Sequence, residues 1–486
     1  MTDDLQKEMG KAEVTIVDLG ESIPLQKKFL KVLQTELAGV MTLGALTRVR
    51  GSTTTFLVPC AVEEHIRKVK SLEPEQWKNW LTTHGANRAE RLKSDAYLSL
   101  LEQRASAHND SSAAATKISS ASGSKPTSPW ADDDFPVDFD REPDWHIGPQ
   151  GVNAVAAWKM FWARAKFKTP PWAKIRIAHI DTGYTEHAAL GWNNGQSTTV
   201  DVASGHSYWL FDGPDARDDL EGPNGGHGTR ISGAISGFYL KAPVKPYYGV
   251  APRATIVPYR VTDSVFIDHV KDKIAQAIDE AILKKCSVIN ISLGGLAPLQ
   301  QLARAFDRAY EAGVIVVCAA GQGIPWVIYP GRYNRCITMG GVGPGLLPWA
   351  SGATGKCVDL CAPADAIRRI RARAFPHGQT SADMYEAPDG DGTSYAAAAC
   401  SGIAALWLAW HGFDKFEKKY GQDRWKIPRA FKVLAKQTAT PGNWPQGSKR
   451  YGAGVINAAQ LLAAELPDVT QLTKPALAGD AFDAED

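Results

Sequence analysis

The most regular hydrophobic pattern lies between residues 151 and 466, where short apolar runs alternate with amphipathic stretches. Five apolar runs have the length of buried strands: 175–180, 255–261, 288–293, 314–320 and 336–341. In 270–285 and 299–312, apolar residues recur every three or four positions, which predicts helices. Strands that alternate with helices are typical of a mostly parallel sheet covered on both faces. The pattern therefore predicts an α/β fold with a doubly wound, mostly parallel sheet over residues 137–466.

A different pattern precedes this region and predicts a second, smaller α/β domain over residues 1–72. Its elements follow in the order β-α-β-β-α: strand-like runs at 14–19, 40–49 and 53–58, and helical stripes at 25–37 and 62–69. No final strand is evident. The remaining segments are expected to be a helical extension at 73–106, a Ser/Ala-rich linker at 107–136 and an acidic, disordered tail at 467–486.

Composition and charge narrow the class of protein. Lys and Arg number 54 against 52 Asp and Glu, so the formal net charge of +2 argues against a nucleic-acid-binding protein. A content of 44% hydrophobic and 22% charged residues is ordinary for a globular protein. No run of 18 apolar residues occurs, and the first 20 residues lack the apolar core of a signal peptide. We therefore expect a cytoplasmic protein without a membrane partner, although non-classical export stays open.

The seven cysteines are an odd number in a long chain, and several lie in apolar runs. This favours buried free thiols in a reducing compartment. Cys357 and Cys361 could begin a metal site, but no second Cys/His pair stands nearby to complete four ligands. We therefore expect no metal site.

Three short segments carry groups suited to nucleophilic hydrolysis: His179–Gly183, Gly225–Thr229 and Gly392–Ala397. They contain Asp181 at a strand end, His227 between glycines, and Ser394 before a helix. A serine needs an imidazole to accept its proton, and the imidazole needs a carboxylate to fix its tautomer. Each segment alone has a plainer interpretation as a turn acid, a structural histidine or a helix cap. Their joint occurrence in an α/β region favours catalysis.

The order of Asp181, His227 and Ser394 resembles that of the subtilisin-like serine protease family, the subtilases. Further motifs of this family are matched in order by five segments: 248–254, 288–295, 317–323, 329–330 and 452–459. The resemblance covers about residues 145–465. It implies that Ser394 is the nucleophile, that His227 is the general base and acid, and that Asp181 orients His227.

The resemblance also implies roles in substrate binding. Ser292, Leu293 and Gly294 would pair with the substrate backbone as an added strand. The first specificity pocket would be lined by a second set of residues: Ala320, Gly321, Gly323 and Ile328. Ile328 stands where the family commonly has glycine at the pocket base, so we expect a narrower pocket and a small P1 residue.

One departure concerns the oxyanion hole, which the resemblance places at Ser394 and Gln322. Gln322 stands where the family has asparagine, and it keeps the amide donor on a side chain one methylene longer. Calcium sites are common in the family, so calcium is possible, but no clear ligand loop is present. The charge run Asp215–Glu221 is interpreted as a solvated surface segment, and no other cofactor is expected.

The smaller N-terminal domain is similar to the propeptides of this family, ferredoxin-like units that cap the active site. The alternative is a permanent regulatory or partner-binding domain. The favoured function is a serine endopeptidase that acts on polypeptide through an acyl-enzyme, restrained by its own N-terminal region. The competing function is a pseudoprotease that binds peptides or acts as a scaffold. A regulatory protein partner is also possible.

Overall fold

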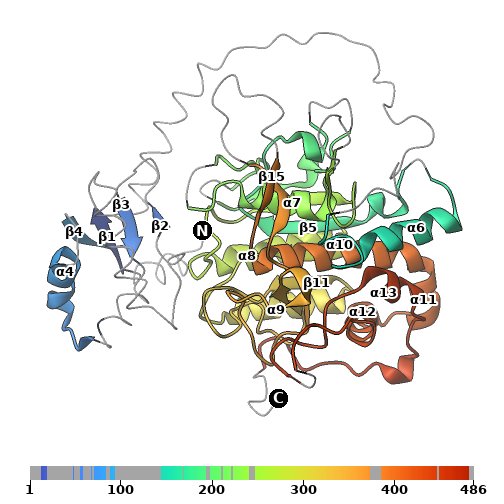
Figure 1. Cartoon of the computed structure of the whole chain (residues 1–486). Helices are drawn as coiled ribbons and strands as arrows, with labels where there is room; N and C mark the ends of the chain where they lie inside the picture. Colours follow the sequence, from blue (N-terminus) through green and yellow to red (C-terminus); the bar gives the residue numbers. More distant parts are fainter. Residues whose placement is uncertain are drawn as a thin grey trace, which may run out of the picture. The chain divides into compact units, whose positions relative to one another are not determined.

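The computed structural model describes residues 13–18, 47–48, 55–58, 67, 70–83, 88–93 and 144–480, the last with gaps at 168, 193–196, 210–211, 221–222, 240–246, 373–384 and 446–447. The chain divides into two compact units, Met1–Lys125 with Glu221–Pro223, and Pro126–Leu220 with Asn224–Asp486 (Figure 1). The linker predicted at 107–136 lies outside the described residues.

The larger unit is built on a seven-stranded sheet of order β13-β12-β11-β10-β5-β9-β6 (Figure 1). Its strands are β5 (Arg176–Asp181), β6 (His206–Ser207), β9 (Thr255–Arg260), β10 (Val288–Ile291), β11 (Ile315–Ala319), β12 (Ile337–Val342) and β13 (Leu360–Pro363). Every neighbouring pair is parallel. The prediction of a mostly parallel sheet is confirmed, and each of the five predicted strands is present.

Helices cover both faces of this sheet and form two separate apolar layers. One layer is formed with α6 (Ala154–Arg164), α7 (His227–Ser236), α10 (Thr393–His411), α12 (Lys426–Gln437) and α13 (Ala458–Ala463). The other is formed with the two predicted helices, α8 (Lys271–Leu283) and α9 (Gln300–Glu311). Side chains on both faces of the sheet are therefore removed from water, which is the doubly wound arrangement expected from the sequence.

Helix α10 runs through the middle of the first layer, and its residues 393–408 are all buried. Such a helix is apolar on every side because it is surrounded by protein. Within the described residues, no single helix meets the length and hydropathy needed to cross a membrane. Only α10 together with α11 (Phe413–Tyr420) does so, and these two are bent by 76°.

A hairpin that the sequence pattern did not predict lies between β13 and α10. It pairs β14 (Ile367–Ile370) with β15 (Tyr385–Gly390) in antiparallel register. The hairpin packs on α7, where a Cβ built on Gly233 would lie 2.6 Å from Cδ1 of Ile370. Only glycine at this helix position allows so close an approach.

The expectation of a disordered tail is wrong for residues 467–480, which pack on the larger unit. A short 3-10 turn, η7 (Val469–Gln471), is followed by an extended segment against α9. Nε of Arg335 donates to the carbonyl of Ala476 at 3.0 Å, and the N–H of Ala478 donates to Oδ1 of Asp307 at 2.9 Å. Ala478 is buried at 1% exposure, so this segment adds to the second apolar layer.

The smaller unit contains a four-stranded antiparallel sheet of order β2-β3-β1-β4. Its described elements are β1 (Glu13–Asp18), β2 (Thr47–Arg48), β3 (Thr55–Val58), α4 (Pro74–Thr83) and β4 (Arg88–Lys93). The prediction of helix throughout 73–106 is wrong at β4, which supplies the final strand missing from the sequence pattern. Its sequence, Arg-Ala-Glu-Arg-Leu-Lys, has few strand-favouring residues, so periodicity gave little signal.

Six cysteines lie in the described part of the chain, and all six are unpaired. Five of them are buried, and only Cys357 is partly accessible. Burial raises the pKa of the Cys286 and Cys361 thiols to about 12. These side chains are therefore protonated at neutral pH and pack as small apolar groups.

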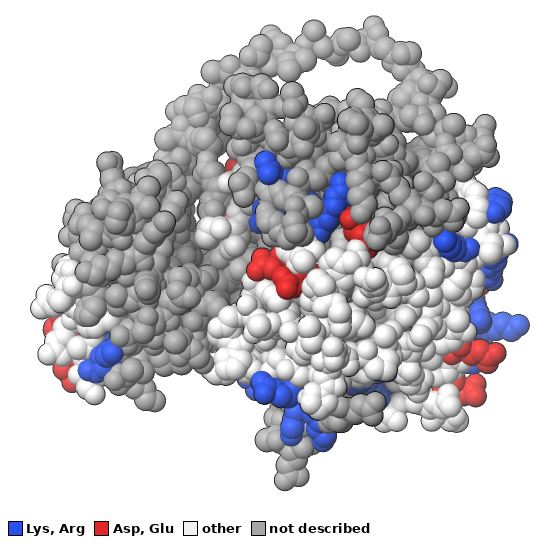
Figure 2. Space-filling model, viewed as in Figure 1, with Lys and Arg blue, Asp and Glu red and all other residues white. Residues whose placement is uncertain are grey.

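On the face shown in Figure 2, the described surface carries both acidic and basic side chains, as the near-neutral charge suggests.

Candidate active site

The three predicted catalytic residues come together at the carboxyl edge of the sheet. Asp181 is the last residue of β5, His227 begins α7, and Ser394 is the second residue of α10. Nδ1 of His227 lies 2.7 Å from Oδ1 of Asp181, and Nε2 of His227 lies 3.2 Å from Oγ of Ser394. A single imidazole therefore bridges a buried carboxylate and a hydroxyl, the arrangement that nucleophilic catalysis requires.

The Asp181 carboxylate is held in its ionised form. Burial by itself would raise the pKa of Asp181, but the charge of His227 and hydrogen bonds with His179 and His227 outweigh it and bring the pKa well below its ordinary value. Nε2 of His179 lies 3.4 Å from Oδ2 of Asp181, and the N–H of Thr182 donates to Oδ1 at 2.8 Å. A permanently charged Asp181 favours the imidazolium form of His227 during proton transfer.

The loop before His227 is tied to the loop after Asp181 by a buried carboxylate. Oδ2 of Asp218 accepts hydrogen bonds from Oγ1 of Thr182 at 2.6 Å and from the N–H of Gly226 at 2.7 Å. Oγ1 of Thr182 in turn accepts from the N–H of Gly228 at 3.0 Å. The residues on both sides of His227 are thus fixed relative to the strand that carries Asp181.

Sequence reasoning missed this role of Asp218. The interpretation of Asp215–Glu221 as a solvated charge run is wrong at Asp218, whose exposure is 6%. Burial raises the pKa of Asp218, while hydrogen bonds from Thr182, Leu220 and Gly226 oppose that rise. The only signal in the sequence was a carboxylate close to His227, which does not distinguish a surface acid from a buried one.

A chain of hydrogen bonds between buried polar groups connects Ser394 to the end of β10. Its Oγ lies 3.2 Å from the carbonyl oxygen of Ser292, and Oγ of Ser292 donates to the Ser394 carbonyl at 3.2 Å. Nδ2 of Asn290 donates to Oγ of Ser292 at 3.0 Å, and Oγ of Ser401 donates to Oδ1 of Asn290 at 2.9 Å. These bonds join β10 to the first turns of α10 and fix the position of the nucleophile.

Gln322 lies beside the turn that carries Ser394. Its Oε1 accepts a hydrogen bond from the N–H of Thr393 at 3.3 Å, and a Cβ on Gly392 would lie 3.0 Å from the same oxygen. The longer glutamine side chain therefore reaches the N-terminus of α10. A half-turn of its amide would present Nε2, a donor, at the place now taken by Oε1.

Ile328 fills the space between Gly294, predicted to pair with the substrate backbone, and Gly321, predicted to line the specificity pocket. A Cβ on Gly294 would lie 2.0 Å from its Cδ1, and a Cβ on Gly321 would lie 2.8 Å from its Cγ1. The N–H of Ile328 donates to the carbonyl of Ala320 at 3.0 Å. Gly323 is exposed, and its N–H donates to the Ser351 carbonyl at 2.8 Å. A single side chain thus determines how much room is left between Gly294 and Gly321.

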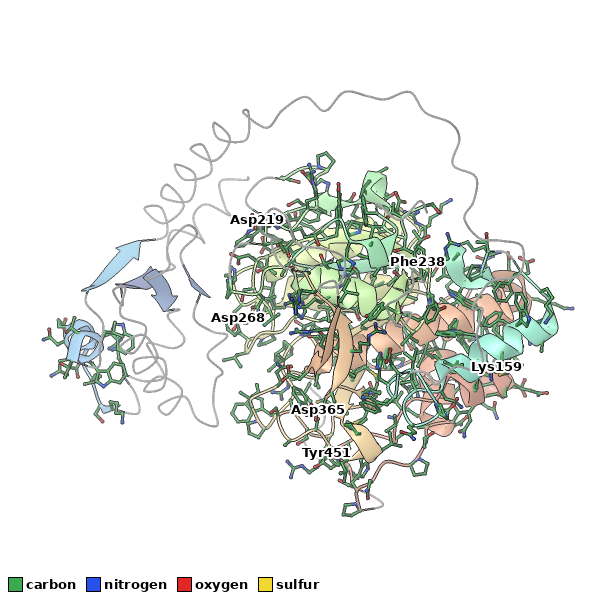
Figure 3. The ribbon with its side chains drawn as sticks, turned by 45° about the horizontal axis from the view of Figure 1, so that its top comes forward. Lys159, Asp219, Phe238, Asp268, Asp365 and Tyr451 are labelled. Atoms are coloured by element: carbon green, nitrogen blue, oxygen red, sulfur yellow. The ribbon has the colours of Figure 1, made fainter. Side chains whose placement is uncertain are left out.

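The backbone of Gly294 is already engaged with another segment of the chain. Its N–H donates to the carbonyl of Val265 at 2.9 Å, and its carbonyl accepts from the N–H of Ile267 at 3.0 Å. These are the groups expected to pair with a substrate strand. The turn after Gly294 is held by Asp268 (Figure 3), whose Oδ2 accepts from the N–H of Leu296 at 3.0 Å. Leu293 points into the second apolar layer and is buried.

In the described part of the chain, no group of three or more His, Cys, Asp or Glu side chains is arranged to hold a metal ion. Cys357 and Cys361 carry free thiols, and Sγ of Cys361 donates to the Tyr451 carbonyl at 3.2 Å.

Comparison with known proteins gives the family of this arrangement. The model of the Subtilase family matches residues 173–454, which include Asp181, His227, Ser394 and Gln322. The chain belongs to the subtilase family. The match spans the sheet from β5 to β13 and continues through α10, so the subtilase region coincides with most of the larger unit.

Curated subtilases align with about half of the chain. The major intracellular serine protease of Bacillus subtilis is 28% identical over 226 residues, covering 45% of this chain and 65% of that protein. Subtilisin Savinase of Lederbergia lenta is 26% identical over 285 residues, covering 58% of this chain and 89% of that protein. The chain thus covers just under two-thirds of the first relative. The crystal structure of MycP1 with its N-terminal propeptide removed matches at 21% identity and a TM-score of 0.48, covering 67% of this chain and 99% of that chain.

Proposed function

We propose that this subtilase is a serine endopeptidase that hydrolyses peptide bonds through an acyl-enzyme. The observation that carries the proposal is the pair of contacts at His227, 2.7 Å to Asp181 and 3.2 Å to Ser394. Family membership supports peptide hydrolysis as the reaction class. A purely structural role would not require a hydroxyl within 3.2 Å of an imidazole whose other nitrogen meets a permanently charged carboxylate.

The proposed reaction uses one proton acceptor twice. Oγ of Ser394 attacks the peptide carbonyl carbon while Nε2 of His227 takes the hydroxyl proton. His227 then gives that proton to the leaving amine as the C–N bond breaks, which leaves an ester on Ser394. Water attacks this ester, Nε2 accepts a proton from the water, and return of the proton to Oγ releases the acid and restores the enzyme.

The developing oxyanion would be stabilised at the N-terminus of α10. The backbone N–H of Ser394 lies in the first turn, where helix N–H groups lack intrahelical partners. The side-chain amide of Gln322 is the second proposed donor, because it already reaches the adjacent N–H of Thr393. This arrangement requires the Gln322 amide to turn when substrate binds.

A small P1 residue is the proposed specificity. Ile328 fills the space that Gly294 and Gly321 leave open, so a bulky P1 side chain would have to displace it. Glycine or alanine at P1 needs no such displacement.

The N-terminal unit is proposed to restrain the protease. Its four-stranded antiparallel sheet with β1 between β3 and β4 supports a ferredoxin-like, propeptide-like unit. We also propose a cytoplasmic location, supported by the six free cysteines among the described residues and by similarity to an intracellular protease. A calcium ion and a regulatory protein partner stay proposals carried only by the family.

The competing proposal is a pseudoprotease that binds peptides without cleaving them. It is favoured by one observation, the pairing of both Gly294 backbone groups with Val265 and Ile267. A protein locked in this state would retain the triad geometry without admitting an extended substrate.

A fluorophosphonate probe tests the proposed activity, since it reacts only with an activated serine. We expect covalent labelling of the full chain, measured by intact mass, and its loss in Ser394→Ala. Ser197→Ala, which changes an exposed serine outside the residues assigned to the site, is the matched control and should label like the unaltered protein. Absence of labelling in folded protein freed of residues 1–137 would exclude the endopeptidase and favour the peptide-binding alternative.

A further inference from the structure

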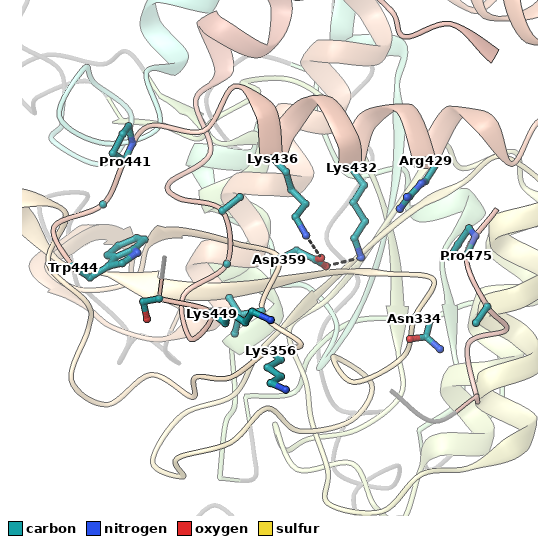
Figure 4. Close-up of a pocket in the computed structure, with 16 residues that line it drawn as sticks. Asn334, Lys356, Asp359, Arg429, Lys432, Lys436, Pro441, Trp444, Lys449 and Pro475 are labelled. Atoms are coloured by element: carbon teal, nitrogen blue, oxygen red, sulfur yellow. Dashed lines mark hydrogen bonds and ion pairs between the residues drawn. The ribbon is translucent and has the colours of Figure 1, made fainter. Parts of the chain in front are cut away.

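A second cavity lies at the opposite edge of the sheet from Ser394. It has a volume of about 860 Å³ and is lined by α12, by the turn before β13, by residues of the 441–453 loop and by Pro475 and Ala476 (Figure 4). Asn334 and Asp359 precede β12 and β13, so they mark the amino ends of these parallel strands. The triad follows carboxyl ends, and none of its residues lines this cavity. A cavity of this volume accommodates a small molecule.

Cationic side chains dominate the lining. Among the described lining residues there are five cations, Lys356, Arg429, Lys432, Lys436 and Lys449, and one carboxylate, Asp359, which leaves an excess of four positive charges. Arg429, Lys432 and Lys436 are spaced three and four residues apart, so they lie on one face of α12, as Figure 4 shows. Together they span roughly 10 Å along the helix axis.

Asp359 holds two of these cations in place without neutralising the cluster. Its Oδ2 lies 2.8 Å from Nζ of Lys432, and its Oδ1 lies 3.4 Å from Nζ of Lys436. The N–H of Thr338 also donates to Oδ2 at 3.0 Å, which fixes the carboxylate at the sheet edge. One carboxylate shared by two ammonium groups leaves a positive charge unbalanced beside them. Asp359 thus positions Lys432 and Lys436, while the excess positive charge of the lining remains.

Arg429 supplies an unused donor. Its Nε is buried and has no hydrogen-bond partner among the described residues, although the side chain lines the cavity. A buried guanidinium N–H without an acceptor is unfavourable, and an anionic oxygen would satisfy it. Lys356 and Lys449 are exposed and approach the cavity from other segments.

From this geometry we propose that the cavity binds a small polyphosphate anion, either free or as the polyphosphate of a nucleotide. Phosphate groups carry several charges in a short chain, and each oxygen accepts from Arg or Lys donors. A tri- or tetravalent anion of this kind matches the excess charge and the length of the cluster. An acidic peptide carries at most one charge per residue, so four charges occupy about 13 Å of extended backbone and are less densely placed than those of a polyphosphate.

Isothermal titration of the full chain with sodium tripolyphosphate tests the proposal. We expect one site per chain, an affinity that falls as ionic strength rises, and an increase in melting temperature on saturation. Arg429→Gln should weaken binding by about tenfold or more, because a charge-assisted hydrogen bond is lost. The double variant Lys356→Gln/Lys449→Gln, which changes only exposed residues, should weaken it in a protein with unaltered folding.

The controls separate this site from general attraction of anions. Lys418→Gln, an exposed change on α11 outside the cavity, should leave tripolyphosphate affinity unchanged. ATP titrated in parallel distinguishes the source, since equal affinity for ATP assigns the site to nucleotides and weaker binding assigns it to free polyphosphate. Undetectable tripolyphosphate binding, equal losses in all three variants, or tighter binding of tetraglutamate than of tripolyphosphate would overturn the proposal.

Discussion

The size of one side chain governs the space beside the nucleophile. Ile328 contacts the positions where Gly294 and Gly321 lack a Cβ, so the volume that these glycines leave open is filled from a third segment. Because both glycines lack a side chain and lie in backbone that directly follows β10 and β11, the pocket cannot widen by side-chain motion at these two positions. Selectivity at this position therefore depends on Ile328 itself.

Replacing Ile328 with glycine should move the preference toward large P1 residues. We expect the ratio of kcat/KM for a Phe substrate over the matching Ala substrate to rise by at least about tenfold, since removing a clash and adding apolar contact each contribute at this scale. The measurement is hydrolysis of two peptide anilides that differ only at P1. Leu283→Ala, an exposed change at the end of α8, should keep the original ratio. A constant ratio in Ile328→Gly would show that another residue limits the pocket.

At the residue scale, the sequence was sufficient for groups that stand in recognisable motifs. Asp181, His227 and Ser394 were predicted because each lies beside glycines in a segment with a distinctive order of residue types. Asp218 and His179 were not assigned roles, because their importance depends on burial and on partners far along the chain. His179 and Asp181 lie two residues apart on β5, so strand alternation places them on the same face. Alternation does not say that His179 contacts the Asp181 carboxylate.

At the scale of secondary structure, the segment Val265–Ile267 occupies the backbone groups of Gly294 that the proposed substrate strand would use. The segment Val265–Ile267 forms two hydrogen bonds with Gly294, and Phe266 and Gly294 form a parallel bridge. A substrate strand that pairs with Gly294 must take over both bonds. The exchange costs little enthalpy, since bonds are replaced one for one, but it requires Val265–Ile267 to move away.

Hydrogen exchange can follow this movement. We expect the amides of Gly294 and Ile267 to be protected in the free protein. On binding a peptide chloromethyl ketone, Gly294 should stay protected by the inhibitor, while Ile267 loses its acceptor and exchanges faster. The amide of Gly295, which donates to the Tyr329 carbonyl at 2.8 Å, is the internal control and should not change. Continued protection of Ile267 in the inhibited protein would contradict the exchange of partners.

At the element scale, prediction followed the strength of the periodic signal. Five of the seven strands of the central sheet and the helices α8 and α9 were predicted within one or two residues because long apolar runs alternate with clear amphipathic stripes. β14 was missed because its four residues include two arginines, and β15 because it contains Pro388 and Gly390, so both segments carry a weak strand signal. β4 was assigned to helix for the same reason, since its pairing with β1 and not its own sequence makes it a strand.

The whole chain joins a subtilase unit to a smaller unit whose role is proposed to be inhibitory. If the smaller unit restrains the protease, residues 138–486 alone should hydrolyse peptide anilides severalfold faster than the full chain. Mass spectrometry of the purified full chain should also detect cleavage between Ala107 and Pro136, absent in Ser394→Ala. Equal rates for both forms, with no cleavage, would reject autoinhibition by residues 1–106.

The unpaired thiols have a consequence for the whole molecule. Five of the six described cysteines are buried, and burial raises the thiol pKa of four of them, Cys286, Cys318, Cys361 and Cys400, so these four offer almost no thiolate to an electrophile. The described cysteines form no disulfide, so a reducing solution breaks no covalent cross-link among them. A buried sulfur reacts with a thiol reagent only when the surrounding apolar layers separate. The rate of thiol modification therefore measures how often the core opens.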